Sequence, residues 1–145
     1  MKQINFIYES EEHFEEMISK EKFIEENLLI FLFSDESIEK IQNIIKSIKS
    51  YFPASILAGA SSAGTINEGK TIEGRSLVVF YQFEKIIPKA IIMPSSEYSD
   101  QSMALEIKNK IVSDQSKLLF LFSDGLDMNS HILLNEIDKL MPNLP

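Results

Sequence analysis

The chain has 145 residues, a formal net charge of −8, 44% hydrophobic residues and no cysteine. Its length and apolar content suffice for one domain with a single core, while its acidity and its sole arginine, Arg75, argue against nucleic acid, anionic membranes and phosphate-rich partners. The lack of cysteine excludes disulfides and thiol catalysis. Because the sequence shows neither a signal peptide nor an apolar run of ~20 residues, we expect a soluble cytoplasmic domain that does not enter a membrane.

The first third of the chain reads as strand, helix, strand, helix. Residues 4–8 predict a short strand, and Ser10 then caps an acidic helix. The continuous apolar run over residues 28–33 is typical of a strand covered on both faces, which predicts a central parallel strand. Residues 34–37 end that strand and cap a helix that must end before Pro53.

The rest of the chain continues the alternation of strands and helices. We predict, in order, a strand of small residues from Ile56, a turn at residues 67–70, strands over residues 76–83 and 89–93, a helix capped by Ser99, a buried strand over residues 118–122, and a helix over residues 126–140. Turns on both sides of residues 76–83 favour antiparallel pairing there. The predicted fold is therefore α/β, with a mixed, mostly parallel β-sheet flanked by helices.

An internal repeat accompanies this pattern. The sequence Phe-Leu-Phe-Ser-Asp occurs at residues 31–35 and again at residues 120–124, and each copy is followed at the same spacing by a proline, Pro53 and Pro142. This predicts a duplicated strand–helix unit. Because the second copy stops where the first continues into a strand, we expect the chain to be the N-terminal portion of a larger domain.

The run of small residues from Gly59 to Thr65 is the main candidate for a binding site. Segments with such small side chains let a backbone or a ligand approach main-chain groups closely, so the run fits either tight strand packing or a ligand contact. The residues expected to contact a ligand here are Gly59, Ala60, Ser61, Ser62, Gly64 and Thr65.

Asp35, Asp124 and Arg75 are further candidates. Aspartates beyond the carboxyl ends of strands can serve as phosphoacceptors or magnesium ligands, although helix capping is their commoner role. Arg75 can clamp a ligand carboxylate or remain solvated in its turn.

Enzyme motifs in the same run are incomplete. Ser61 within Gly59–Ala63 partly matches a nucleophile elbow, but Ala63 replaces the closing glycine. The Walker glycine spacing of Gly59 and Gly64 is followed by Thr65 where the phosphate-binding lysine is required. We expect no catalytic residue, cofactor or metal.

Residues 57–66, Leu-Ala-Gly-Ala-Ser-Ser-Ala-Gly-Thr-Ile, resemble the signature of the FIST sensory domain in its N-terminal part. The resemblance extends to the Phe-containing strand end at residues 31–34, Phe52-Pro53 and the Gly-Arg-Ser-Leu-Val-Val segment at residues 74–79. The resemblance covers about residues 28 to 142. It implies a core of the domain over residues 28–145, preceded by a leading segment over residues 1–27. Ala60 departs from the family, which often has cysteine there.

The resemblance implies an intracellular domain of a bacterial signalling protein that binds a small metabolite such as an amino acid. It also implies an attached output module: a diguanylate cyclase, a histidine kinase or a chemotaxis signalling region. We expect the ligand to lie against the Gly59–Thr65 run, with an ammonium group recognised by Ser34, Asp35, Ser123 and Asp124. Two alternatives remain: an enzyme or phosphoacceptor that uses Asp35, Asp124 or Ser61, and an interaction module that binds a basic partner.

Overall fold

The computed structural model describes residues 1–123, 130–142 and 144. The chain divides into two compact units, Met1–Pro88 and Lys89–Pro145. The elements of the first unit are β1 (Lys2–Tyr8), α1 (Glu11–Ser19), the 3-10 turn η1 (Glu25–Asn27), β2 (Leu28–Ser34), α2 (Ile38–Tyr51), β3 (Ile56–Ser61), β4 (Thr65–Asn67), β5 (Lys70–Ile72) and β6 (Ser76–Gln82). Those of the second are η2 (Ser95–Glu97), α3 (Asp100–Ile111) and α4 (Ser130–Leu140).

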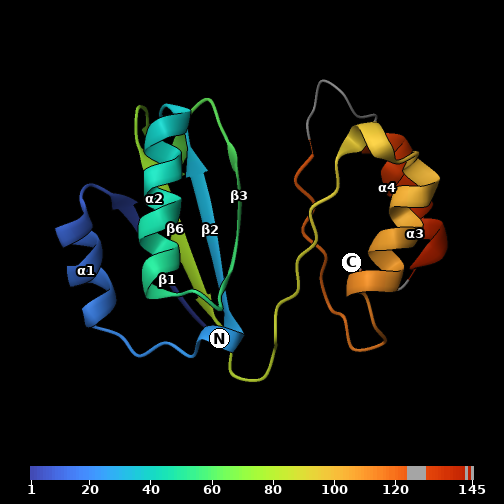
Figure 1. Cartoon of the computed structure of the whole chain (residues 1–145), viewed down its shortest axis with the longest axis horizontal. Coiled ribbons are helices and arrows are strands. Elements are labelled where there is room, and N and C mark those ends of the chain that lie inside the picture. The colour runs from blue at the N-terminus through green and yellow to red at the C-terminus, as the bar shows by residue number, and fades with distance from the viewer. Residues whose placement is uncertain (124–129, 143, 145) are drawn as a thin grey trace. The chain divides into compact units, whose positions relative to one another are not determined.

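The first unit is built on a four-stranded sheet with the order β1-β6-β2-β3 (Figure 1). β6 pairs antiparallel with both β1 and β2, and β3 pairs parallel with β2. The prediction of a mixed sheet is confirmed. The prediction of a mostly parallel sheet is wrong, because β6 lies between β1 and β2 and runs antiparallel to both, which leaves β2 and β3 as the parallel pair. β4 and β5 form a separate hairpin.

Both helices of the first unit cover the same face of the sheet. Phe14 of α1 and Ile48 of α2 pack in one core cluster with Ile30 and Phe80, and all four side chains are buried. The predicted caps are confirmed: the Ser10 hydroxyl accepts from the His13 amide at 3.2 Å, and α2 ends at Tyr51, just before Phe52 and Pro53. The opposite face carries a second cluster, of Leu29, Phe31, Leu77 and Val79.

The second unit packs α3 against α4. Buried residues on the two helices meet in one cluster with Met141, which follows α4 directly. The cluster consists of Met103, Ala104, Ile107, Leu133, Ile137 and Met141. Ser99 caps α3 as predicted, because its hydroxyl accepts from the Ser102 amide at 3.2 Å. The predicted start of the last helix, at residue 126, falls outside the described residues.

Two predicted strands of the second unit are wrong. Residues 89–93 and 118–122 form no strand, and Leu118 and Phe120 are 57% and 53% exposed. A strand needs a neighbouring strand to accept its backbone hydrogen bonds, and an apolar sequence does not supply that partner. The repeat is therefore not confirmed: its helical halves agree, with Leu133 and Ile137 buried like Ile44 and Ile48, but its strand halves differ.

Candidate functional site

Four strand ends meet at one edge of the sheet in the first unit. Tyr8 at the end of β1 pairs with Ser76 at the start of β6, Ser76 pairs with Ser34 at the end of β2, and Ser34 pairs with Ser61 at the end of β3. We call this row the Ser34 edge. The loops that follow β1, β2 and β3, and the loop that precedes β6, therefore all leave from the same side, which is where open α/β sheets commonly bind ligands.

A buried network of hydroxyls and one carboxylate closes the Ser34 edge. The Ser76 hydroxyl donates to Glu36 Oε2 at 2.6 Å and lies 2.7 Å from the Ser34 hydroxyl. Since a hydroxyl has a single proton, Ser34 must donate to Ser76, and Ser34 in turn accepts from the Glu36 amide at 3.1 Å. Lys40 completes the network by an ion pair with Glu36 at 3.2 Å. Ser34, a predicted ligand contact, thus already uses its hydroxyl within the fold.

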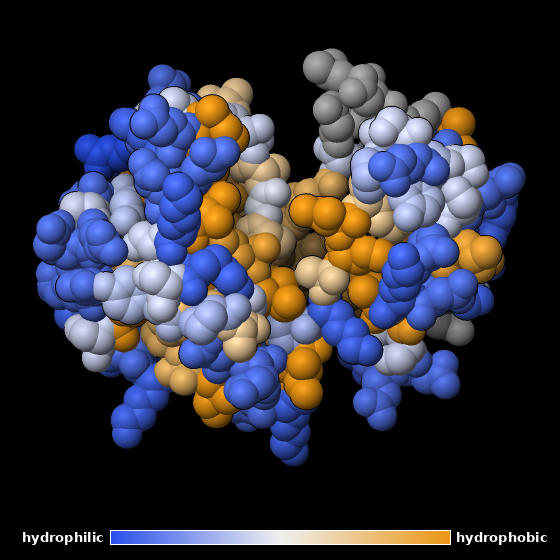
Figure 2. Space-filling model, viewed as in Figure 1, coloured by the Kyte–Doolittle hydropathy of each residue, from blue (hydrophilic) through white to orange (hydrophobic). Residues whose placement is uncertain are grey.

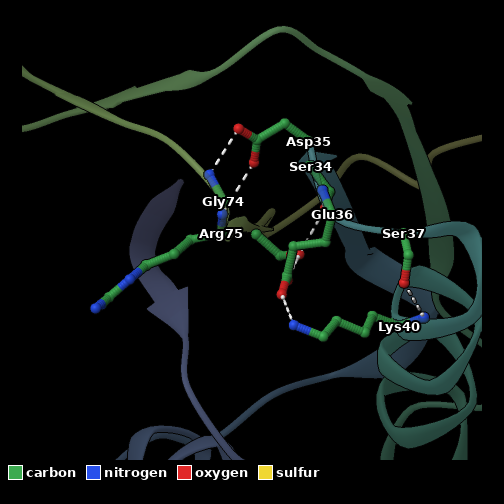
Figure 3. Close-up of polar contacts among 8 residues, drawn as sticks. Ser34, Asp35, Glu36, Ser37, Lys40, Gly74 and Arg75 are labelled. Carbon is green, nitrogen blue, oxygen red and sulfur yellow. Dashed lines mark hydrogen bonds and ion pairs between the residues drawn. The ribbon is translucent and has the colours of Figure 1, made fainter.

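Asp35 holds the loop that precedes β6. Its carboxylate accepts from the amides of Gly74 at 2.7 Å and of Arg75 at 2.9 Å (Figure 3). The Gly74 amide, followed by that of Arg75, lowers the pKa of Asp35. Gly74 has a φ of 67°, a left-handed backbone conformation that favours glycine. The helix cap itself is made by Ser37, whose hydroxyl accepts from the Lys40 amide.

Arg75 lies on the outer side of this loop. Its side chain points away from Asp35 (Figure 3), and its Nη1 lies 3.4 Å from Oε1 of Glu9. Both side chains are more than half exposed. A hollow of about 350 Å³ opens beside the guanidinium and is lined by Tyr8, Glu9, Glu36, Gly74 and Arg75. One guanidinium and two carboxylates therefore face the same space.

At one position of the small-residue run, tight packing requires a glycine. A Cβ added to Gly59 would lie 1.9 Å from the carbonyl oxygen of Leu32 on β2. No side chain fits there, so the packing interpretation of the run holds at this residue. Ala60 and Ser61, at the end of β3, are exposed.

The residues after β3 form a compact turn into the β4–β5 hairpin. The Ser62 amide donates to the carbonyl of Ser34 at 2.9 Å, and the Ser62 hydroxyl accepts from the Gly64 amide at 3.1 Å. Thr65 is 5% exposed, and its hydroxyl has no hydrogen-bond partner among the described residues. A buried hydroxyl without a partner is destabilising, so Thr65 has a buried hydrogen-bonding group that a ligand could satisfy.

The remaining predicted contacts are Ser123 and Asp124. Ser123 lies in the second unit, where its hydroxyl is 3.1 Å from that of Ser130, and Asp124 lies outside the described residues. Sequence reasoning missed Tyr8, Glu9 and Glu36. Tyr8 ends a predicted strand, and Glu9 and Glu36 follow predicted strands by one and three residues. Their convergence depends on the placement of β1 beside β6, which the sequence did not specify.

Two features are absent from the part of the chain that the structure describes. It contains no group of three or more histidines, aspartates or glutamates that could hold a metal ion. Nor is any helix within it long and apolar enough to cross a membrane.

The chain was compared with protein families, curated proteins and solved structures. A family model described as the FIST N domain matches residues 28–145, which is most of the chain and includes the Ser34 edge except for the segment that contains Tyr8 and Glu9. A search of curated proteins found no match, and a search of solved structures found none either.

Proposed function

Because the chain belongs to the FIST N domain family, whose members are sensory domains of signalling proteins, we propose that it senses a small zwitterionic metabolite such as an amino acid at the Ser34 edge. The observation that carries this proposal is the charge pattern of the hollow beside Arg75. A guanidinium and the carboxylates of Glu9 and Glu36 line it together. That arrangement complements a molecule that carries a carboxylate and an ammonium group on one carbon.

The polar groups have suitable geometry for this task. Arginine binds a carboxylate through two parallel hydrogen bonds, and the exposed pair of Arg75 with Glu9 at 3.4 Å is weak enough for a ligand carboxylate to replace. Asp35 accepts hydrogen bonds from the amides of Gly74 and Arg75. These contacts hold the backbone that carries the arginine side chain in one position. Glu9 is then available for the ammonium group, and Glu36, which accepts from Ser76 and pairs with Lys40, adds a second negative charge to the hollow.

The volume of the hollow also suits a small metabolite. About 350 Å³ lies at the lower end of the range for small-molecule sites. Ser61 continues the same row of the sheet through its pairing with Ser34, and Thr65 has an unused hydroxyl. We propose that Ser61, Ser62 and Thr65 contact the ligand side chain. Ser123 and Asp124 remain predictions.

Sensing requires the ligand to bind two conformations with different affinity. The loop between β5 and β6 is a suitable reporter, because Asp35 ties it to the start of α2. We propose that ligand binding alters this loop and thereby the surface offered to an output module: a diguanylate cyclase, a histidine kinase or a chemotaxis signalling region in the cytoplasm. Recognition of this kind involves no covalent step, and the engagement of Asp35 by two amides favours a sensor over a phosphoacceptor.

A thermal-shift screen followed by calorimetry tests the proposal. The chain is screened with the L-amino acids, and each hit is repeated as its D-enantiomer, its methyl ester and its N-acetyl derivative, so that chirality, carboxylate and ammonium are each altered in turn. At about 100 times its Kd a ligand adds roughly 2.7 kcal/mol to the free energy of unfolding. We expect a stereoselective hit that is lost in both blocked derivatives.

The variant Arg75→Gln localises the site. It should weaken the hit by at least about tenfold, since it replaces a charged two-point contact by a neutral one. Lys46→Gln on α2 removes the same charge away from the hollow and should leave affinity unchanged. Equal binding by wild type and Arg75→Gln, or the absence of any hit, would overturn the assignment.

A further inference from the structure

A second hollow in the first unit lies at the opposite end of the helices. It has a volume of about 410 Å³ and is bordered by the last turns of α1 and α2. α2 begins beside the Ser34 edge and is 14 residues long, which separates the two hollows by about 20 Å of helix. It is thus distinct from the site proposed above.

Aromatic side chains form the floor of this second hollow. Phe23, Tyr51 and Phe52 line it, and the rings of Phe23 and Phe52 meet edge to face with centroids 5.2 Å apart. Phe52 also packs against Phe80 of β6 at 5.5 Å, so the floor is anchored to the core of the sheet. Aromatic faces attract cations, and a desolvated cation gains most from them.

Carboxylates form the rim. Glu15 accepts a hydrogen bond from the Tyr51 hydroxyl through Oε1, and Glu25 accepts one from the Ala54 amide at 2.8 Å through Oε2. These contacts fix the two carboxylates in place. The second oxygen of each, Oε2 of Glu15 and Oε1 of Glu25, has no hydrogen-bond partner among the described residues and can accept one from a ligand.

The third rim carboxylate already binds an ammonium group of the chain itself. Lys2 of β1 places its Nζ against Oε2 of Glu21. Glu21 is 27% exposed, in keeping with a partly sheltered rim. Even after this ion pair, the charges of Glu15 and Glu25 remain unbalanced by any ion pair among the described residues.

We propose that this aromatic floor and acidic rim form a binding site for an ammonium group carried on an aliphatic stem. The stem packs on Phe23 and Phe52, and the ammonium group lies between Glu15 and Glu25. The same chemistry is offered by a free alkylamine and by a lysine side chain of a partner protein. The net charge of −8 favours the approach of either cation.

Titration of the isotopically labelled chain with n-butylammonium, followed by amide NMR shifts, tests this inference. n-Butanol serves as the uncharged probe of the same length, and Nα-acetyl-lysine amide represents a partner side chain. We expect butylammonium to shift the amides of Phe23, Tyr51 and Phe52, and butanol to leave them unchanged. Binding of acetyl-lysine amide as well would identify a protein partner as a source, whereas its failure to bind would restrict the site to free amines.

Two double variants that lose the same charge distinguish binding at this site from the general attraction of a cation to the acidic chain. Glu15→Gln combined with Glu25→Gln keeps the side-chain shapes and should weaken butylammonium by at least about tenfold. Glu39→Gln combined with Glu68→Gln removes two exposed charges elsewhere and should have little effect. If the first double variant does not fold, Glu15→Gln alone decides the question.

Three results would overturn the inference: equal shifts with butanol, equal weakening by the two double variants, or unchanged binding after loss of the rim charges. The variant Arg75→Gln keeps this test independent of the zwitterion site. It should bind butylammonium like the wild type, whatever its effect on amino-acid binding.

Discussion

The hydroxyl oxygens of Ser34 and Ser76 lie 2.7 Å apart in the interior of the first unit, where the two residues are 1% and 0% exposed. They join the end of β2 to the start of β6, and through Glu36 they reach the entrance of α2. One buried polar network therefore links the loops that carry Glu36 and Arg75, in addition to the contacts that Asp35 makes with Gly74 and Arg75.

Removing one member of that network should destabilise the fold. We expect Ser76→Ala to lower the free energy of unfolding by about 1–3 kcal/mol, because it leaves the hydroxyl of Ser34 and the carboxylate of Glu36 without their partner. Urea denaturation measures the loss. Ser50→Ala, on the exposed face of α2, is the control and should change stability by less than about 0.5 kcal/mol. A loss as small as that in Ser76→Ala would mean that solvent replaces the network.

Gly59 should be intolerant of any side chain. We expect Gly59→Ala to cost more than about 3 kcal/mol or to prevent folding, because its Cβ would overlap the backbone carbonyl of Leu32, which cannot rotate away. Gly69→Ala is the matched control. Gly69 has a φ of 76° but nothing within 4 Å of the added Cβ, so the substitution should cost about 1 kcal/mol of backbone strain. Similar losses in the two variants would show that conformation, not contact, selects Gly59.

The sequence predicted the first unit well wherever the structural signal is local. The caps at Ser10 and Ser37 and the end of α2 before Pro53 are local signals, readable within one turn of helix. The long apolar run of β2 identified a central strand. The tight approach of Gly59 to Leu32, in contrast, follows from the parallel pairing of β3 with β2, which a run of small residues permits but does not specify.

The errors lie where structure depends on distant partners. Residues 118–122 have the same apolar character as β2, yet they form no strand, since pairing is decided by another segment of the chain. Likewise, Glu9 and Arg75 are 66 residues apart in sequence and meet because β1 and β6 are antiparallel neighbours. No motif marks Glu9, so the acidic half of the proposed zwitterion site was not predictable from residue types alone.

Asp35 should make stability depend on acid pH. Its pKa is lowered in the folded chain, chiefly by the Gly74 amide, from an ordinary value of 3.8. Its contribution is therefore present above that ordinary value and is lost as the pH falls through the lower folded value. We expect acidification from about pH 5 to pH 2.5 to destabilise the wild type more than Asp35→Asn, as measured by urea midpoints. Asp114 is an exposed carboxylate in the second unit, so Asp114→Asn should show the same loss of stability as the wild type. If Asp35→Asn also lost as much stability as the wild type, the two amide contacts would not persist in solution.

Tyr51 should ionise at an unusually high pH. The hydrogen bond to Glu15 raises the pKa of Tyr51 to about 12, because a phenolate cannot donate and is repelled by the carboxylate. Since the folded pKa lies above the ordinary value of 10.0, this contact contributes stability below pH 10, and that contribution is lost as the pH rises towards 12. Ultraviolet titration of the four tyrosines should show a late transition that disappears in Tyr51→Phe and moves to lower pH in Glu15→Gln. Tyr98→Phe should retain it. A late transition unchanged by Glu15→Gln would assign the effect to burial and would remove the fixed carboxylate on which the proposed ammonium site depends.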